Sequence, residues 1–317
     1  MGLEEWPTST GRSISWCDVA SVREVKNIAR VIGAADRDNS DGGDGNQGKK
    51  ITVNDVFVSC VAQAVRRQLV ELEDEKKLVN KDVIIETGSE TTIRSDIGPS
   101  RWDINVVVPV HLSGGVLPPG RGMGNLIGAF VARIKDDVGT TEKGNINNNK
   151  GDNHGIKSTE AKRSSSSSSS LSSSQLSSSS ASDRLIITHD ALAGPKASPA
   201  PLISFLLARV ASKCLPNAWT ECILRRSNAN ASVAVTNSRG FQDKVTINGR
   251  VLEAAVGFFP LPPGLPVGVV VQSYGGKVSL SVAAEKWAVP DADRFLLWVL
   301  EEYDDLRREA GGKVKPC

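Results

Sequence analysis

The sequence predicts an α/β fold in which helices are layered on a mixed β-sheet. Three observations lead to this prediction. Near the C-terminal end, short runs rich in β-branched residues are joined by tight-turn sequences. Elsewhere, apolar residues recur with helical spacing, so that helices and strands alternate along the chain. At 317 residues, the chain holds one large domain or two small ones, with ample apolar surface for a core.

The first predicted element is a helix that begins at Ser21. Ser21 and Glu24 have the spacing of a capping box. One apolar face then follows, formed by Val22, Val25, Ile28, Ala29 and Ile32. Gly33 is a natural helix end, and the Gly/Asp/Asn-rich segment 36–50 is predicted to be a loop.

The second predicted helix begins after Thr52, which is a good N-cap residue. Asp55 occupies the third helical position, where its charge complements the helix dipole. The buried stripe is predicted to comprise Val53, Val56, Phe57, Cys60, Val61, Ala64, Val65 and Leu69. Arg66, Arg67 and Gln68 fall mostly outside this stripe.

Two strands are predicted in the middle of the chain. The run 104–110 is almost continuously apolar, and Pro109 suggests an edge strand or a bulge. A second strand is predicted over 126–134. The segment 139–182 passes from Gly/Asn/Lys-rich sequence into a serine tract that cannot offset its ordering entropy, so it is predicted to be a disordered insertion.

An unusually apolar helix is predicted over 201–215, opened by Pro201. Two interpretations of its apolar excess remain open. It is a core helix between two halves of the protein, or it docks on a lipid surface with Arg209 and Lys213 on the remaining face.

The last third of the chain predicts two consecutive β-hairpins. A strand at 232–236 is followed by a hairpin whose turn is Asn248-Gly249, a dipeptide that tolerates positive φ at both central positions. Gly275-Gly276 then turns a strand at 267–274 back into one at 277–282. A final helix begins near Asp291 and ends at Gly311-Gly312. It is predicted to bury Phe295, Leu296, Val299 and Tyr303.

Composition excludes several classes of function. Lys and Arg together number 38 against 36 for Asp and Glu, so nothing favours a nucleic-acid partner. The five cysteines have neither the spacing of a disulfide framework nor that of a zinc site, which predicts an intracellular protein without a metal. The acidic N-terminus lacks the features of a signal peptide, and no apolar run is long enough for a transmembrane helix. Any membrane contact is therefore expected to be peripheral.

Several motifs resemble one known family. T-N-S-R-G at 236–240, S-Y-G-G-K-V-S-L-S-V-A-A-E-K at 273–286 and P-D-A-D-R at 290–294 resemble the C-terminal domain of wax ester synthase/diacylglycerol acyltransferases. T-V-N-D-V at 52–56 resembles the family's Asn-Asp motif, and G-N-L-I-G-A at 124–129 resembles its Gly-Asn segment. With the insertions discounted, the resemblance covers most of residues 13–310.

This resemblance implies the C-terminal half of a chloramphenicol-acetyltransferase-like acyltransferase fold. The expected organisation is a central acyltransferase segment at 1–138 containing the loop 36–50, the disordered Ser-rich insertion 139–182, the C-terminal domain 183–311 and a tail at 312–317. The family transfers a fatty acyl group from acyl-CoA, a co-substrate, to a long-chain alcohol or diacylglycerol, and the resemblance implies no bound cofactor.

The family's catalytic signature, H-H-x-x-x-D-G, is not found in this sequence. The histidines are His111, His154 and His189, and no two are adjacent. No catalytic residue is therefore assigned, and the chain is expected to lack the N-terminal catalytic half. It is then a truncated product or a half that works with a separate N-terminal partner or by self-association. The alternative is a non-catalytic lipid-binding or scaffold protein with the same fold.

The resemblance also assigns channel or support residues, namely Asn54, Asp55, Gly124, Asn125, Asn237 and Gly240. Asn54 is expected to offer an amide hydrogen bond toward the channel. Asp55 is expected to hold the helix start or to pair with an arginine across the interface between the two halves. Ordinary helix-start and turn chemistry alone also accounts for these residues.

His189 and Asp190 are interpreted as surface residues rather than an acid/base dyad, because neighbours on a helix do not face each other. His111 is a somewhat better site candidate. Without an N-terminal half, the sheet face carrying 106–110 and 267–271 is expected to lack cover. The resemblance places the protein inside the cell, either free or peripheral to the endoplasmic reticulum, the plasma membrane or a lipid droplet.

Overall fold

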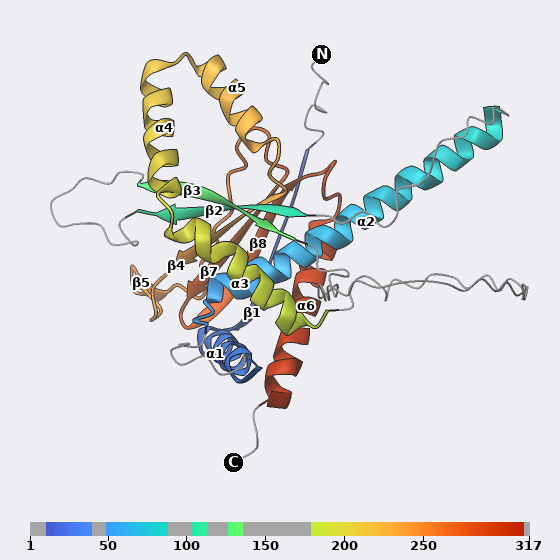
Figure 1. Ribbon diagram of the computed structural model, residues 1–317. Helices are drawn as coiled ribbons and strands as arrows, with labels where there is room; N and C mark the ends of the chain where they lie inside the picture. The colour runs from blue at the N-terminus through green and yellow to red at the C-terminus, as the bar shows by residue number, and fades with distance from the viewer. Residues whose placement is uncertain (1–10, 40–48, 88–102, 113–125, 136–178, 314–317) are drawn as a thin grey trace, which may run out of the picture.

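The computed structural model describes residues 11–39, 49–87, 103–112, 126–135 and 179–313 (Figure 1). Its strands are β1 (Arg12–Ser21), β2 (Ile104–His111), β3 (Ile127–Ile134), β4 (Val233–Arg239), β5 (Thr246–Ile247), β6 (Arg250–Val251), β7 (Val267–Tyr274) and β8 (Lys277–Glu285). Its helices are α1 (Val22–Asn39), α2 (Val53–Thr87), α3 (Ala181–Ala197), α4 (Ala200–Cys214), α5 (Asn217–Asn228) and α6 (Ala292–Lys313). Gly124, Asn125, His154 and most of the predicted insertion lie outside the described residues.

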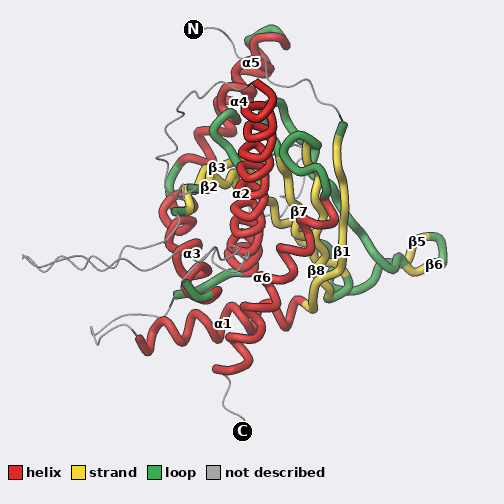
Figure 2. Tube along the Cα trace, turned by 90° about the vertical axis from the view of Figure 1, so that its right-hand side faces the viewer, coloured by secondary structure: helices red, strands yellow, loops and turns green. Residues whose placement is uncertain are grey.

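Six of the strands form one mixed sheet in the order β1-β8-β7-β4-β2-β3. The β2–β4 and β4–β7 pairs are parallel, and the other neighbours are antiparallel. Helices α1, α2, α3 and α6 lie together on one side of this sheet (Figure 2). The predicted α/β class, a mixed sheet layered with helices, is confirmed.

Helix α2 is the centre of the helical layer. Every residue from Asp55 to Arg66 is buried, so the helix has no solvent-facing side over three turns. The expectation of an uncovered sheet face is therefore wrong. The inward side chains of the two strands concerned, Val106, Val108, Val267, Val269 and Val271, are at most 4% exposed.

The two predicted hairpins are confirmed. Asn248 and Gly249 have φ values of 50° and 75°, as a two-residue turn with positive φ at both centres requires. Gly275 and Gly276 repeat this geometry, with φ values of 55° and 80°, between β7 and β8.

Both predicted glycine helix ends are wrong. Helix α1 continues through Gly33 to Asn39, so the loop begins later than residue 36. An added Cβ at Gly33 would lie 2.5 Å from the carbonyl oxygen of Lys49, so this glycine allows a close approach of the chain. Helix α6 likewise continues through Gly311-Gly312 to Lys313.

The side chains of Arg66 and Gln68 are buried, contrary to the prediction for them. Arg66 donates hydrogen bonds to the carbonyl oxygens of Ile134 and Lys135 at 3.3 Å and 2.9 Å. Its guanidinium therefore satisfies the carbonyl groups at the end of β3. A buried charge needs such partners.

Pro109 lies in an interior strand without a bulge, contrary to the prediction. The β2–β4 ladder ends at Val107, so a missing N–H at Pro109 removes no bond to β4. Opposite Pro109 in β3, Ala129 donates its N–H to Ser204 Oγ of α4 at 2.8 Å.

Strand β1 and helix α5 were not predicted. β1 pairs with β8 along nearly its whole length and forms one edge of the sheet. Helix α3 begins at Ala181, so Ala181 and Ser182, which the prediction assigns to the insertion, are helical and buried. Within the described part of the chain, no helix combines the length and hydropathy needed to cross a membrane.

A buried ion pair joins α3 to α6. The Arg184 guanidinium donates to both carboxylate oxygens of Glu302 at 2.8 Å. In the first turn of α3, the backbone N–H groups of Ala181 and Ser182 donate to the carboxylate of Glu309 on α6. Burial raises the pKa of Glu302, and the guanidinium of Arg184 opposes this shift. The start of α3 is therefore held by two carboxylates of α6.

We expect Arg184→Ala to lower the free energy of unfolding by about 3–5 kcal/mol, because it leaves a buried carboxylate without its partner. A group whose pKa is raised by folding destabilises the fold as pH rises through that pKa. The deficit should therefore shrink when the pH is lowered and Glu302 becomes protonated. Urea denaturation at several pH values measures this.

The matched control is Arg307→Ala, which removes an exposed partner of Glu24 and should cost less than about 1 kcal/mol. Equal losses in both variants, or a deficit for Arg184→Ala that is independent of pH, would contradict the assignment.

Candidate functional site

A polar cluster surrounds the N-terminus of α2. Asp55 Oδ2 accepts the N–H of Thr52 at 2.8 Å, and Thr52 Oγ1 accepts the N–H of Asp55 at 3.4 Å. This reciprocal arrangement is a capping box, with Asp in the position usually held by Glu or Gln. Asp55 therefore holds the helix start, one of the two roles expected of it.

Asp55 has a second partner that sequence spacing could not reveal. His189 Nδ1 on α3 lies 2.8 Å from Asp55 Oδ2, and the two side chains are 18% and 4% exposed. The prediction of a surface histidine is thus wrong. The alternative role of Asp55, pairing with an arginine across the interface between the two halves, stays a prediction. The neighbouring Asp190 points elsewhere and pairs with Lys49 at 2.9 Å.

A histidine held by a buried carboxylate has its ring orientation fixed. In enzymes, this arrangement positions a general base. It equally serves as a structural link, here between α2 and α3. The cluster does not meet the requirements of a metal site, since no group of three or more His, Cys, Asp or Glu residues in the described ranges could hold an ion.

Asn54, the other residue of the Asn-Asp pair, is half-buried. Its Oδ1 atom is buried and accepts no hydrogen bond from the described residues. The expected role of Asn54 toward a channel stays a prediction.

The predicted turn residues Asn237 and Gly240 lie at the carboxyl end of β4. Asn237 is exposed and pairs in register with Val271 of β7. Gly240 donates its N–H to the carbonyl oxygen of Ser273 at 2.8 Å, and an added Cβ would approach that oxygen to 2.3 Å. Close packing against β7 therefore explains this glycine, and a channel role for either residue stays a prediction.

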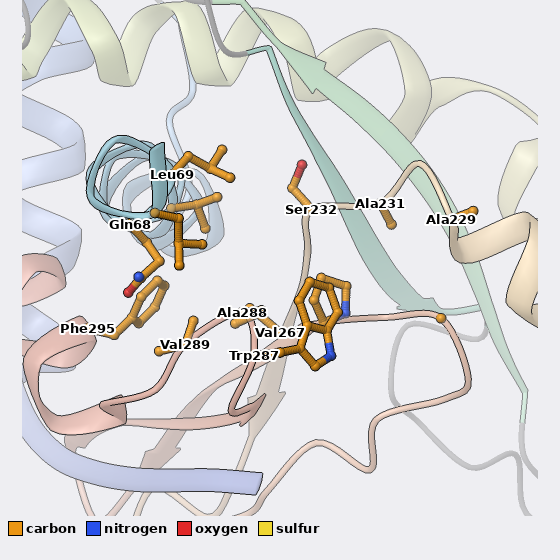
Figure 3. A pocket seen from close by; sticks show the side chains of 14 residues that line it. Gln68, Leu69, Ala229, Ala231, Ser232, Val267, Trp287, Ala288, Val289 and Phe295 are labelled. Carbon is orange, nitrogen blue, oxygen red and sulfur yellow. The ribbon is translucent and has the colours of Figure 1, made fainter. Parts of the chain in front are cut away.

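A cavity of about 220 Å³ lies elsewhere, farther along α2 (Figure 3). Its apolar lining includes Val65 and Leu69 of α2 and Phe295 of α6. Figure 3 shows Gln68 and Leu69 on one side of the opening and the Trp287 indole across from them. The lining is overwhelmingly apolar, which suits an aliphatic or aromatic ligand.

The polar cluster and the cavity are separate places. Asp55 lies in the first turn of α2, whereas the cavity begins at Val65 and extends to Leu72, roughly 15–25 Å farther along the helix axis. None of the described candidates Asn54, Asp55, Asn237 and Gly240 lines the cavity. Sequence patterns missed it because its walls come from segments far apart in the chain.

We expect Asp55→Ala to lower the free energy of unfolding by about 1–3 kcal/mol, since it removes a helix cap and leaves His189 without its partner. The control is Asp190→Ala, which removes only the exposed pair with Lys49 and should cost less than about 1 kcal/mol. Thermal and urea denaturation measure both. A larger loss from the control would show that Asp55 does not anchor α2.

The comparisons with known proteins come from sequence and structure. Residues 172–307 match the family model of the WS/DGAT C-terminal domain. The chain is similar to the solved wax ester synthase/diacylglycerol acyltransferase from Marinobacter aquaeolei VT8, with 15% identity, a TM-score of 0.49, and coverage of 95% of this chain and 50% of that one. It is also similar to the epimerization domain from the third module of tyrocidine synthetase B, with 9% identity, a TM-score of 0.44 and coverage of 95% and 48%.

No curated protein sequence matches the chain. The chain spans about half the length of each of these solved structures. The family match begins before α3 and extends into α6, so it includes the two hairpins and the motifs at their turns. The chain is thus similar, over residues 172–307, to the WS/DGAT C-terminal domain.

Proposed function

We propose that the chain takes part in transferring a fatty acyl group from acyl-CoA to the hydroxyl of a long-chain alcohol or diacylglycerol. The observation that carries this proposal is the family match over residues 172–307. In this reaction, the acceptor oxygen bonds to the acyl carbonyl carbon and the thioester C–S bond breaks. The acceptor's proton passes through a base to the sulfur of coenzyme A.

The sequence lacks the histidine motif that supplies the base in this family. H-H-x-x-x-D-G is not found among its 317 residues. In our proposal, an N-terminal half outside the given sequence provides that histidine, and this chain provides binding surface for the acyl or acceptor chain. The protein works peripherally at a membrane or lipid-droplet surface, where such acceptors reside.

The apolar cavity supports the lipid-binding part of this proposal. An apolar cavity of about 150 Å³ is sufficient to bind benzene, and this one measures about 220 Å³. It therefore suits the end of an aliphatic chain rather than a whole lipid. Each buried methylene contributes about 0.8 kcal/mol, so a few methylenes give useful affinity.

We expect the chain alone to form no wax ester or triacylglycerol above background from palmitoyl-CoA with hexadecanol or diacylglycerol. Turnover should appear when a family N-terminal half that carries the histidine motif is added. Product formation from labelled acyl-CoA measures this, with a motif His→Ala version of the added half as the control.

Ester formation by the chain alone would contradict the proposed source of the base. His189→Gln and His111→Gln would then identify the histidine responsible. Failure of the mixture under conditions where both parts are folded and associated would contradict the acyltransferase proposal itself.

A second candidate function is lipid binding without turnover, which the cavity favours. We expect Leu69→Trp to weaken hexadecanol binding by about tenfold or more, because the indole fills space that the ligand would occupy. Leu297→Trp, at a leucine 57% exposed on α6 and outside the cavity lining, is the matched control. Equilibrium binding measures both variants, and equal affinities would exclude the cavity as the site.

A further inference from the structure

Helices α4 and α5 form an arch, residues 200–228, that projects beyond the sheet (Figure 1). The arch is attached to the sheet at the start of α4, where it contacts β3. Pro201 is buried there, and an added Cβ at Gly128 of β3 would lie 1.9 Å from its carbonyl oxygen. At the far end, Asn228 Nδ2 donates to the carbonyl oxygen of Pro263 at 2.9 Å. The arch is thus fixed at both ends and exposed between them.

Helix α4 presents its aliphatic side to solvent. The side that meets β3 includes the buried Pro201 and the half-buried Ser204, whose hydroxyl accepts the N–H of Ala129. The apolar stripe faces away from it and consists of Leu202, Ile203, Leu206, Leu207 and Val210, which are 49–65% exposed. Within this chain, the stripe is therefore not part of the core, and its role as a core helix between two halves stays a prediction.

Helix α5 also exposes apolar side chains and has no buried residue. Trp219 is 66% exposed, and Ile223 and Leu224 are also exposed. A cluster of exposed apolar residues this large on one projecting element is unusual for a surface that stays in water.

The charges beside this surface are almost all positive. The arch carries Arg209, Lys213, Arg225 and Arg226 against a single acidic residue, Glu221. Glu221 pairs with Arg225 at 2.9 Å. The remainder of the chain is close to neutral, because the net charge of the whole chain is only +2. The arch therefore carries a net charge of +3, whereas the rest of the chain sums to −1.

We propose that this arch docks on an anionic lipid surface, with the α4 stripe and Trp219 entering the interface and the four cations meeting headgroups. Apolar residues beside Lys and Arg on an exposed helix are the features of interfacial lipid binding. Lys and Arg keep their charged ends in the headgroup layer while their stems cover apolar surface, and the charge complements anionic lipids. The inference extends the proposed function by naming the contact surface, and vesicle binding tests it independently of acyl transfer.

The experiment is flotation of the full chain with phosphatidylcholine vesicles, with and without phosphatidylserine. Binding should be about tenfold or more tighter with phosphatidylserine and should weaken in high salt. Leu206→Glu with Leu207→Glu should weaken binding by about tenfold or more. Arg225→Gln with Arg226→Gln should weaken it by about fivefold for each cation removed, on anionic vesicles only.

Two controls match these variants on α6. Leu297→Glu changes an exposed leucine away from the arch, and Arg307→Gln with Arg308→Gln changes a second exposed arginine pair. Both should bind within about twofold of the parent chain. The altered residues are exposed, so unchanged melting temperatures should accompany each loss of binding.

Three outcomes would overturn the proposal. The first is no vesicle binding by the parent chain. The second is equal loss in arch and control variants. The third is self-association of the parent chain without lipid, if the variant Leu206→Glu with Leu207→Glu abolishes it. The α4 stripe would then be a protein interface.

Discussion

The burial of α2 on all sides from Asp55 to Arg66 is the constraint on which the rest of the structure depends. In such a segment, charged side chains need partners inside the protein. Asp55 is satisfied by Thr52 and His189, and Arg66 by the carbonyl oxygens at the end of β3. These contacts fix how α3 and the sheet are placed around α2. The same helix then forms one wall of the apolar cavity.

Features that depend on neighbouring residues were predictable from the sequence. The Asn248-Gly249 turn and the Thr52–Asp55 cap follow from local backbone preferences. Features that depend on distant residues were not predictable. His189 lies 134 positions from Asp55, so nothing in its local sequence distinguished it from a surface residue. Arg66 was misassigned for a related reason, because its partners are carbonyl oxygens that carry no sequence signal.

The cavity was also beyond sequence prediction, because its walls come from α2, from the segments before β4 and β7, and from the start of α6. The family match covers only part of the sheet and of the hydrophobic core. Residues 172–307 supply β4, β7 and β8 to the sheet, but β1, β2 and β3 come from outside that range. Both portions contribute side chains to one hydrophobic core. The matched region is therefore a sequence unit that completes its core with preceding segments.

The contact between Gly128 and Pro201 also bears on the edge of the sheet. β3 is an edge strand, and such strands offer unpaired backbone groups to other chains. The first turn of α4 covers this edge and takes up the N–H of Ala129. A side chain at position 128 would displace Pro201 and expose the edge of β3. The start of the arch therefore covers part of an edge that would otherwise be open to pairing with another strand, a role distinct from contact with a lipid surface.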